Sequence, residues 1–460
     1  MHSKPSSSLL KCMYFIFIFL IVCTSTFLIF NNILWNDIYP IYKSKIINKN
    51  KNIDLKPFFN KDNLTKYVDC PIYFNSNSNF NITQRISIIR NLKNLSVTCE
   101  DIRKRRFFPS IPLSKEEDEF PLSFSFTVYT EYFFIELLLS LIYQPQNFYC
   151  FAIDAKQDGE FRSKIHSLTN CFENVFVSKI EYDMNSKGLN NVKSHRECLK
   201  KLNNYNWKYV FLLQNHDFPL KTNAELVQIL KLFDQTSDFL VLPPLLKRVN
   251  LLLDWTFGGL KIFKNEKKIN SSIYTRKIEF SKGYSAVAIS RQTYDYMTNE
   301  LNLTAYQNNF DVYPVFGNDE MFWQSLFVNY EILKIPGTIP SHCIGKKDSQ
   351  SFYTRFAQWE YGKDFYEKCL SHTLRHYVCL LGVEYLKTFE SNEHFFLNKM
   401  LQSFDFAAID CWSERLFNRT YFPYQYSKID MKKYDNRIQK RFQDFLKVSQ
   451  NISGFNCEIN

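Results

Sequence analysis

Glycine is scarce in this chain, and the nucleotide-binding motifs that depend on glycine are missing. Only 11 of the 460 residues are glycine, and no G-x-G triplet occurs. Dinucleotide-binding folds and P-loops both need glycine where the backbone approaches a phosphate closely. The sequence therefore excludes both of these nucleotide sites.

Two metal-binding patterns are also absent. The chain has no Asp-x-Asp triplet, a common clamp for a divalent cation, and its 12 cysteines contain no C-x-x-C pair. A zinc site is therefore not expected, and we predict neither a metal nor another cofactor. If a diphosphate leaves during a reaction, Lys or Arg side chains or helix N-termini must stabilise its charge.

The chain carries excess positive charge without a nucleic-acid motif. The net charge is +11, and the basic residues are scattered among Asn and acidic residues. We therefore expect no nucleic-acid partner. With 17% aromatic residues, the chain can bury a large core in two or three average domains, or in one large α/β domain with extra segments.

An uncharged apolar segment lies near the N-terminus. Cys12–Phe30 is 19 residues long, about the length that a helix needs to cross a bilayer. Lys4 and Lys11 precede it, and the next lysine is Lys43. The positive-inside rule therefore predicts a cytosolic tail and a luminal body. A cleaved signal peptide is the alternative, although the run is long for one and lacks a small-residue cleavage site.

The rest of the chain divides into a stem and a larger domain. The segment from Asn31 to about Pro57 mixes Lys, Asn and Ile without a clear period, and a helix is expected over Gln84–Leu95. The predicted division is a cytosolic tail (1–11), a transmembrane signal-anchor (12–30), a stem (31–111) and a luminal domain (112–460).

Two features agree with a luminal body. Ten of the twelve cysteines follow the apolar segment, which favours disulfides. Asn-x-Ser/Thr sequons, each weak alone, follow it at Asn63, Asn81, Asn94, Asn270, Asn302, Asn418 and Asn451. A single-pass type II membrane glycoprotein of the secretory pathway is predicted.

Strand and helix patterns alternate from Leu122 onward. Expected strands include Leu122–Thr130, Phe148–Ala155, Asn174–Ser178, Tyr209–Leu213, Asp238–Pro244 and Tyr284–Ser290, with helical patterns between several of them. This alternation of strands and helices predicts an α/β fold with a doubly wound, mostly parallel sheet and helices on both faces.

One strand end is unusually polar. The apolar run Tyr209–Leu213 is followed by "QNHD", and Thr222 with Glu225 then forms a capping box that opens a helix. In open α/β sheets, ligands bind at the carboxyl ends of strands, which makes His216 and Asp217 candidates for a site. An ordinary strand-turn-helix connection is the alternative.

An acidic pair opens another expected helix. In "FGNDEMFWQSLFVN", Asn318 is a plausible N-cap, which places Asp319 and Glu320 in the first helical turn, where the helix dipole favours ionised carboxylates. A general base must be ionised in the resting enzyme. The alternative is that these residues only stabilise the helix.

Taken together, several ordered segments resemble the core-2/I-branching β-1,6-N-acetylglucosaminyltransferase family (glycosyltransferase family 14). The resemblance covers roughly Pro112–Leu416 and rests on "PLSKEEDEFP", "IYQPQNFYCFAIDAK", "CFENVFVSK", "NWKYVFLLQNHDFPLKTN", "FSKGYSAVAISRQ", "GNDEMFWQSL", "RFAQWEY" and "HFFLNKM". It implies a GT-A-like domain in a Golgi type II membrane protein. It further implies inverting, metal-independent transfer from a nucleotide sugar, which fits the absent Asp-x-Asp.

The resemblance assigns catalytic and diphosphate roles to specific positions. It implies that Glu320 is the catalytic base and that Lys399 contacts the donor diphosphate. A second cation falls on Arg375 or His376, where the register slips by one residue. The alternative for Lys399 is an ordinary surface lysine.

Further positions are implied for the nucleoside and the acceptor. Val128 and Asp154 match positions that hold the uridine nucleotide, and Trp359 with Tyr361 matches positions that line the acceptor site. The two aromatic residues have a plain alternative as core residues.

The family's cysteine pattern can also be mapped onto this chain. It implies the pairs Cys70–Cys411, Cys99–Cys171, Cys150–Cys198 and Cys369–Cys379. Cys343 and Cys457 remain and form either a fifth bridge or free thiols.

Departures from the family pattern affect the expected substrates. "GLNNV", Gly188–Val192, replaces a Trp-Ser-Arg-Val type segment, so a donor-side Arg is missing, and the loop between Leu246 and Glu279 also differs. UDP-GlcNAc is the favoured donor, and a mucin-type O-glycan, extended through a β-1,6 linkage, is the favoured acceptor. The alternatives are glucose or xylose transfer, or an inactive glycan-binding relative.

Overall fold

The structure is a computed structural model. Contacts divide the chain into Met1–Pro57 and Phe58–Asn460, and only the second unit is considered below. The structure describes residues 56–75, 85–88, 95–265, 267, 270–312, 316–360 and 368–459. The expected anchor at 12–30 lies outside these residues. Within them, no helix combines the length and the apolar character needed to cross a membrane.

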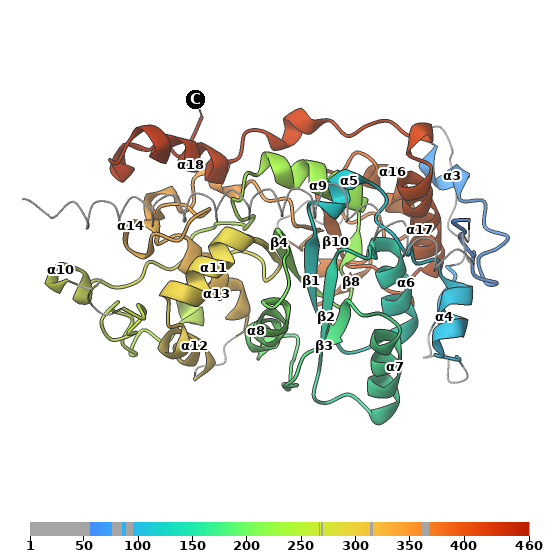
Figure 1. Ribbon diagram of the computed structural model, residues 1–460, viewed down its shortest axis with the longest axis horizontal. Coiled ribbons are helices and arrows are strands. Elements are labelled where there is room, and N and C mark those ends of the chain that lie inside the picture. Colours follow the sequence, from blue (N-terminus) through green and yellow to red (C-terminus); the bar gives the residue numbers. More distant parts are fainter. Residues whose placement is uncertain are drawn as a thin grey trace, which may run out of the picture. The chain divides into compact units, whose positions relative to one another are not determined.

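A five-stranded sheet forms the centre of the larger unit (Figure 1). Its order is β3-β2-β1-β4-β6, and every neighbouring pair is parallel except β4 with β6. The strands are β1 (Leu122–Val128), β2 (Phe148–Ile153), β3 (Val175–Val177), β4 (Tyr209–Gln214) and β6 (Val287–Ser290). The predicted α/β fold with a mostly parallel sheet is confirmed.

Alternate residues of each central strand enter two separate cores. In β4, Tyr209 and Phe211 belong to one buried cluster, whereas Val210 and Leu212 belong to the other. Because successive side chains point to opposite faces of a sheet, both faces must be covered. The predicted helices on both faces are therefore confirmed.

The helices divide between these two faces. Buried residues of α6 (Tyr132–Ile142), α7 (Gly159–Asn170) and α9 (Asn223–Leu232) join the first core. Residues of α8 (Asn191–Leu202) and α13 (Asp319–Phe327) join the second. The other helices are α3 (Pro71–Phe74), α4 (Cys99–Arg105), α5 (Lys115–Asp118), α10 (Ser271–Tyr274), α11 (Arg291–Glu300), α12 (Thr304–Asp311), α14 (Tyr330–Leu333), α16 (Leu386–Phe389), α17 (Phe406–Tyr421) and α18 (Ile438–Val448).

Late segments of the chain return to the end of β4. A small sheet has the order β5-β10-β7, formed by β5 (Phe218–Pro219), β10 (Phe396–Asn398) and β7 (Arg355–Ala357). A separate hairpin joins β8 (Leu374–Arg375) to β9 (Val378–Cys379). The small sheet brings residues far apart in sequence beside the polar tip of β4.

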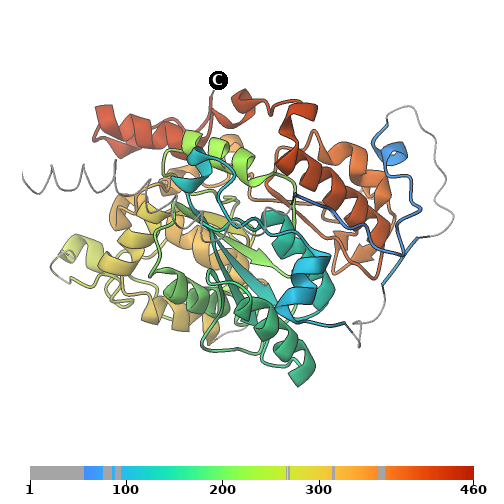
Figure 2. The ribbon, with the colours of Figure 1, turned by 45° about the vertical axis from the view of Figure 1, so that its right-hand side comes forward.

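Disulfides form within the compact unit. All of the pairs implied by the family pattern are present: Cys70–Cys411, Cys99–Cys171, Cys150–Cys198 and Cys369–Cys379. The question left open for the remaining cysteines is also answered, because Cys343 and Cys457 form a fifth bridge. The Cys70–Cys411 bond joins the segment before α3 to α17, and Figures 1 and 2 both show these helices side by side.

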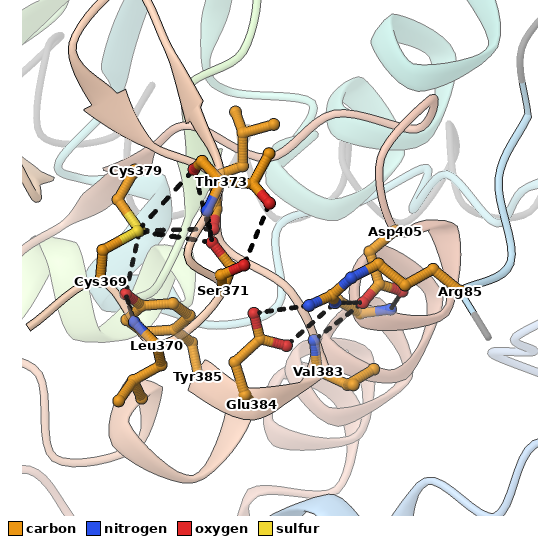
Figure 3. Close-up of polar contacts among 12 residues, drawn as sticks. Arg85, Cys369, Leu370, Ser371, Thr373, Cys379, Val383, Glu384, Tyr385 and Asp405 are labelled. Atoms are coloured by element: carbon orange, nitrogen blue, oxygen red, sulfur yellow. Dashed lines mark hydrogen bonds and ion pairs between the residues drawn. A yellow bond between two sulfur atoms is a disulfide. The ribbon is translucent and has the colours of Figure 1, made fainter. Parts of the chain in front are cut away.

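The N-terminal segment around Arg85 docks through polar contacts. Arg85 Nη1 lies 3.0 Å from Glu384 Oε2 and 2.5 Å from Asp405 Oδ2 (Figure 3). The backbone N–H of Ile88 donates to Gln402 at 2.7 Å. Residues 85–88 are not helical, so the expected helix over Gln84–Leu95 is wrong there. Hydrogen bonds to distant backbone groups replace the hydrogen bonds that a local helix would form.

The predicted sequons differ in exposure. Asn63, Asn270 and Asn451 are exposed, Asn302 and Asn418 are partly buried, and Asn81 and Asn94 lie outside the described residues. Asn270 also caps α10, because its side chain accepts a hydrogen bond from the backbone N–H of Ile273 at 3.0 Å. Glycan occupancy at these positions stays a prediction.

Candidate active site

A cavity of about 270 Å³ opens at the carboxyl ends of the central strands. Thr127, Asp154 and Gln214 line it from β1, β2 and β4 or directly after them. This is the edge at which open α/β sheets bind ligands. The position agrees with the prediction that the polar end of β4 borders a site.

Most of the predicted site residues meet in this cavity. Those that line it are Asp154, Glu320, Trp359, Arg375, His376 and Lys399. Val128 does not line it, because its side chain packs with Phe124 and Phe126 in the first core. Tyr361 lies outside the described residues.

Asp319 and Glu320 line one side of the cavity, and Arg248 and Lys282 contact Glu320; these four residues are called the base wall. Glu320 lies in the first turn of α13, and its Oε2 is 2.5 Å from Arg248 Nη1 and 3.7 Å from Lys282 Nζ. Asn318 precedes the helix but does not cap it; its amide donates to Phe310 O at 3.0 Å. The Glu320 carboxylate therefore has two cations as counter-charges.

The second carboxylate of the base wall is enclosed. Asp319 is 5% exposed and accepts a hydrogen bond from Asn191 Nδ2 at 2.9 Å. Burial, followed by the nearby Glu320 charge, raises the Asp319 pKa to about 6. Gly188 has φ +90°, and a Cβ there would overlap the Asp319 carboxylate. The "GLNNV" segment, which departs from the family pattern, therefore supplies a glycine where the backbone lies against the Asp319 carboxylate.

The opposite side, the cation wall, consists of Arg355, Arg375, His376 and Lys399. Arg375 ends β8, and His376 begins a two-residue turn in which His376 and Tyr377 have φ of 52° and 63°. Two successive positive φ angles fit the tight turn that joins twisted antiparallel strands. The Cys369–Cys379 bond links the end of β9 to the segment before β8 (Figure 3).

Lys399 of the cation wall lies close to the positive charges of Arg375 and Arg355. Burial, followed by Arg375 and Arg355, lowers the Lys399 pKa to about 8. In the part of the chain that the structure describes, no carboxylate lies within ion-pairing distance of Lys399 or Arg375. Arg355 Nη1 is 3.6 Å from Asp217 Oδ1.

Asp217 has a structural role at the tip of β4. It is fully buried and accepts hydrogen bonds from Gln214 N at 2.7 Å and Asn398 Nδ2 at 2.8 Å. Asn398 is the last residue of β10 and precedes Lys399. Asp217 thus connects the central sheet to the segment that carries the buried lysine.

Trp359 is half-buried and lies against Tyr284, with ring centroids 6.1 Å apart. It also lines the cavity, so it is placed where an aromatic face can meet a sugar ring. Its predicted acceptor contact is not tested by this placement.

Sequence reasoning missed Arg248, Lys282 and Arg355 as members of the site. Arg248 comes from the loop that departs from the family pattern, whereas Lys282 and Arg355 lie in quoted segments without any distinguishing neighbour. Their roles depend on contacts across 72, 38 and 141 residues of sequence, respectively. Local pattern could not reveal these contacts.

Potential metal ligands were also considered across the described residues. One group of three has ligand atoms close together: His342, Cys343 and Cys457. Its two cysteines are bonded to each other, so they offer no thiolates. This group lies outside the cavity lining.

Comparison with known proteins gives the family. The Core-2/I-Branching enzyme model matches residues 122–390, more than half of the chain. The human "Beta-1,3-galactosyl-O-glycosyl-glycoprotein beta-1,6-N-acetylglucosaminyltransferase" is 29% identical over 70% of this chain and 76% of its own. The human "N-acetyllactosaminide beta-1,6-N-acetylglucosaminyl-transferase" is 28% identical over 70% and 79%.

A zebrafish (Danio rerio) relative named "Beta-1,3-galactosyl-O-glycosyl-glycoprotein beta-1,6-N-acetylglucosaminyltransferase 4" is 29% identical over 71% of this chain and 76% of its own. A solved structure, the S. cerevisiae mannosyltransferase Ktr4p with GDP, is 12% identical over 50% of this chain and 73% of that one. Its TM-score of 0.28 is too low to support an argument. On the strength of the family match, this chain belongs to the Core-2/I-branching family of glycosyltransferases.

Proposed function

We propose that this chain is an inverting, metal-independent glycosyltransferase that moves N-acetylglucosamine from UDP-GlcNAc onto an O-glycan through a β-1,6 linkage. The names of these relatives, which describe β-1,6-N-acetylglucosaminyltransferases, support the transferred sugar and the linkage. The observation that carries the proposal is that Glu320 shares one cavity with Lys399 and Arg375. A base and a cationic diphosphate site are the parts that metal-free transfer needs.

In the proposed reaction, Glu320 removes the proton from an acceptor hydroxyl. The acceptor oxygen attacks the anomeric carbon from the face opposite the leaving group and forms the new glycosidic bond. The bond from that carbon to the phosphate oxygen breaks, and its electron pair leaves with UDP. Configuration at the anomeric carbon inverts because the attack is in line.

Lys399 and Arg375 would stabilise the charge that develops on the departing UDP. Their amine and guanidinium have no acidic partner among the described residues, so a diphosphate need not displace one. A preorganised cationic site of this kind contributes most where water is excluded. It would do the work that a divalent cation does in other transferases.

The Arg248 ion pair gives Glu320 a defined orientation. Arg248 Nη1 contacts Glu320 Oε2 and also donates to Gly317 O at 3.2 Å. Oε1 has no ion-pair partner in the described part of the chain. We assign Oε1 to the acceptor hydroxyl and treat Arg248 as a positioning residue.

The nucleoside and acceptor contacts complete the proposal. Asp154 lies at the end of β2, where its carboxylate receives backbone N–H donors from Lys156 and Met184. We assign it, with the backbone at Val128, to the uridine, and we assign Trp359 and Tyr361 to the acceptor glycan. The predicted type II Golgi arrangement places this domain in the lumen with its substrates.

A donor screen tests the proposed function. The secreted luminal domain is incubated with UDP-GlcNAc, UDP-glucose or UDP-xylose and a core O-glycan acceptor, with and without EDTA. We expect transfer from UDP-GlcNAc that EDTA leaves unchanged. Preferred transfer from another UDP-sugar would replace the donor assignment, and loss of transfer in EDTA would overturn metal independence.

A single substitution tests the base. Glu320→Gln is expected to reduce kcat by about 10²–10⁴-fold, because general-base catalysis is lost. Glu119→Gln, at an exposed position on α5's C-terminal side, is the matched control. Equal turnover by Glu320→Gln and the natural protein would refute the base assignment. Glycan binding without any turnover would favour an inactive glycan-binding relative.

A further inference from the structure

A second hollow, the α11 groove, has a volume of about 410 Å³ and, among the described residues, shares no lining residue with the catalytic cavity. Its walls come from α8, α11, α13 and the connection that leads into α12 (Figure 1). Leu199, Met297, Leu301 and Trp323 form an apolar floor, and each of them is at most 4% exposed. This volume is in the range of pockets that hold small ligands.

Polar side chains complete the lining of the α11 groove. Lys200 and Lys264 are exposed, and Arg196 and Thr298 are half-buried. A sugar ring presents C–H groups on its faces and hydroxyl groups around its edge, and an acetamido group adds a methyl. An apolar floor with a few hydrogen-bonding groups above it therefore suits an N-acetylated sugar.

Part of the groove lining is itself a predicted glycosylation site. Asn302, Leu303 and Thr304 form an Asn-Leu-Thr sequon, and all of these residues line the α11 groove. The sequon residues Asn63 and Asn451 are exposed and do not line it. A glycan on Asn302 would therefore begin inside the groove.

The connection that carries Asn302 is held in place on both sides. Helix α11 ends at Glu300, and α12 begins at Thr304. The backbone N–H of Asn302 donates to Ile262 O at 2.7 Å, and Asn302 Oδ1 accepts from the backbone N–H of Thr304 at 3.1 Å. The amide oxygen thus holds the turn. The amide nitrogen, to which an N-glycan is attached, is not needed for it.

Covalent attachment makes weak packing sufficient. A free sugar must offset the loss of its translational and rotational freedom when it binds. A sugar linked to Asn302 meets the α11 groove at a high effective concentration instead. A groove too weak to capture a free monosaccharide can therefore hold the first sugar of its own glycan.

We propose that the α11 groove holds the first N-acetylglucosamine of a glycan on Asn302, with the ring and the acetamido methyl against the apolar floor. The sugar then covers buried residues of α8, α11 and α13 and stabilises the fold. Trp323 of this floor lies in α13, the helix that begins with Asp319 and Glu320. Unlike the proposed function, this site needs no nucleotide sugar. It requires only that the domain enters the secretory pathway, as predicted.

Enzymatic release of the glycans tests where the first sugar lies. The full-length protein, made in a eukaryotic secretory host, is treated with peptide-N-glycosidase F, and mass spectrometry follows each site. In the native protein, release at Asn302 should be about tenfold slower than at Asn63, because a sugar held in the groove is accessible about a tenth of the time. The denatured protein should lose both glycans at one rate. Equal rates in the native protein would overturn the proposal.

Two matched variants test the floor of the groove. Leu303→Ser keeps the sequon and should speed release at Asn302 about threefold or more, because apolar surface is lost beneath the sugar. Leu64→Ser makes the same change in the Asn63-Leu64-Thr65 sequon, where Leu64 is 56% exposed, and should change neither rate. Melting temperatures show that each variant is folded. An unchanged rate at Asn302 in Leu303→Ser would contradict a sugar seated on this floor.

Thermal unfolding tests what the attached sugar does. Endoglycosidase H trims high-mannose glycans to their first N-acetylglucosamine, so the trimmed protein should keep its Tm within about 1 °C. Asn302→Gln lacks this sugar and should melt about 2–4 °C lower, whereas Asn63→Gln should melt like the natural protein. An unchanged Tm in Asn302→Gln, or an equal loss after trimming, would refute the stabilising role of the first sugar.

Site occupancy separates this proposal from the predicted luminal placement. If no sequon carries a glycan, the predicted placement fails, and the groove proposal fails with it. If Asn63 or Asn451 is occupied and Asn302 is not, the placement stands and the groove proposal alone fails. Neither result changes the proposed role of Glu320 as the base.

Discussion

The base wall and the cation wall face the same cavity but differ in how their charges are balanced. Glu320 in the base wall has Arg248 at 2.5 Å and Lys282 at 3.7 Å. Lys399 and Arg375 in the cation wall have no carboxylate within ion-pairing distance among the described residues. Among the described residues, Glu320 therefore has close counter-charges, and Lys399 and Arg375 have none within ion-pairing distance.

The two walls also differ in construction. The base wall begins at a helix N-terminus, where the dipole favours negative charge. The cation wall is assembled from β7, the β8–β9 hairpin and the residue after β10. Lys399 is half-buried, and among the described residues no carboxylate lies within ion-pairing distance of it.

Within the cation wall, the largest effect is expected from removing the amine of Lys399. Lys399→Met should lower kcat/KM for UDP-GlcNAc about 100-fold or more, because it deletes a stabilising charge at the leaving group. Steady-state kinetics and UDP titration measure this effect. Lys432→Met, at an exposed position, is the control. An unchanged kcat/KM would show that the cation wall does not act on the donor.

The pH dependence should report the same lysine. With a pKa of about 8, Lys399 is charged below pH 8 and loses its charge as the pH rises. The kcat/KM for the donor should therefore fall above pH 8. Lys399→Arg keeps a charge throughout this range and should move the fall to higher pH. If kcat/KM falls over the same alkaline pH range in both proteins, a group other than Lys399 causes the fall.

Opening one disulfide should disturb the cation wall selectively. Replacing Cys369 and Cys379 by Ser should weaken UDP binding about tenfold. The reason is that this change removes the disulfide that closes the hairpin carrying Arg375. Replacing Cys343 and Cys457 removes a bridge outside the cavity and is the control. Equal loss of UDP affinity in both variants would point to general destabilisation.

The smallest of these effects is expected from Arg248, which contacts the base and does not line the cavity. Arg248→Gln should lower kcat about three- to tenfold and leave UDP affinity unchanged, because Arg248 orients Glu320 and does not meet the donor. Lys247→Gln, the exposed neighbouring cation, is the control. Weaker UDP binding in Arg248→Gln would mean that the two walls are not independent.

Local patterns revealed those parts of the molecule that local forces determine. The alternating strand and helix segments predicted the mostly parallel sheet, and the Thr222–Glu225 capping box forms as expected. The pairing of cysteines, and the proposed roles of Glu320 and Lys399, came from the family resemblance and not from local patterns. The sheet then explains why residues so far apart meet at one edge.

Long-range contacts account for what local patterns missed. The Gln84–Leu95 pattern suggested a helix, but residues 85–88 bond to distant backbone. Asn318 stands before α13 and could cap it, yet its amide bonds to Phe310. Arg248 reaches Glu320 from a loop without a recognisable motif. In each case a tertiary partner outweighed the local preference.

Our central proposal is that UDP places its diphosphate against Lys399 and Arg375, which have no carboxylate within ion-pairing distance among the described residues. It is tested most directly by calorimetry of UDP binding at pH 8 in buffers of different ionisation enthalpy. Without UDP, the Lys399 pKa is about 8, so roughly half of the Lys399 amines are protonated at pH 8. A bound diphosphate should complete this protonation, so the protein should take up roughly half a proton per UDP. Lys399→Arg should take up none. Equal proton uptake by the natural protein and Lys399→Arg would contradict the claim.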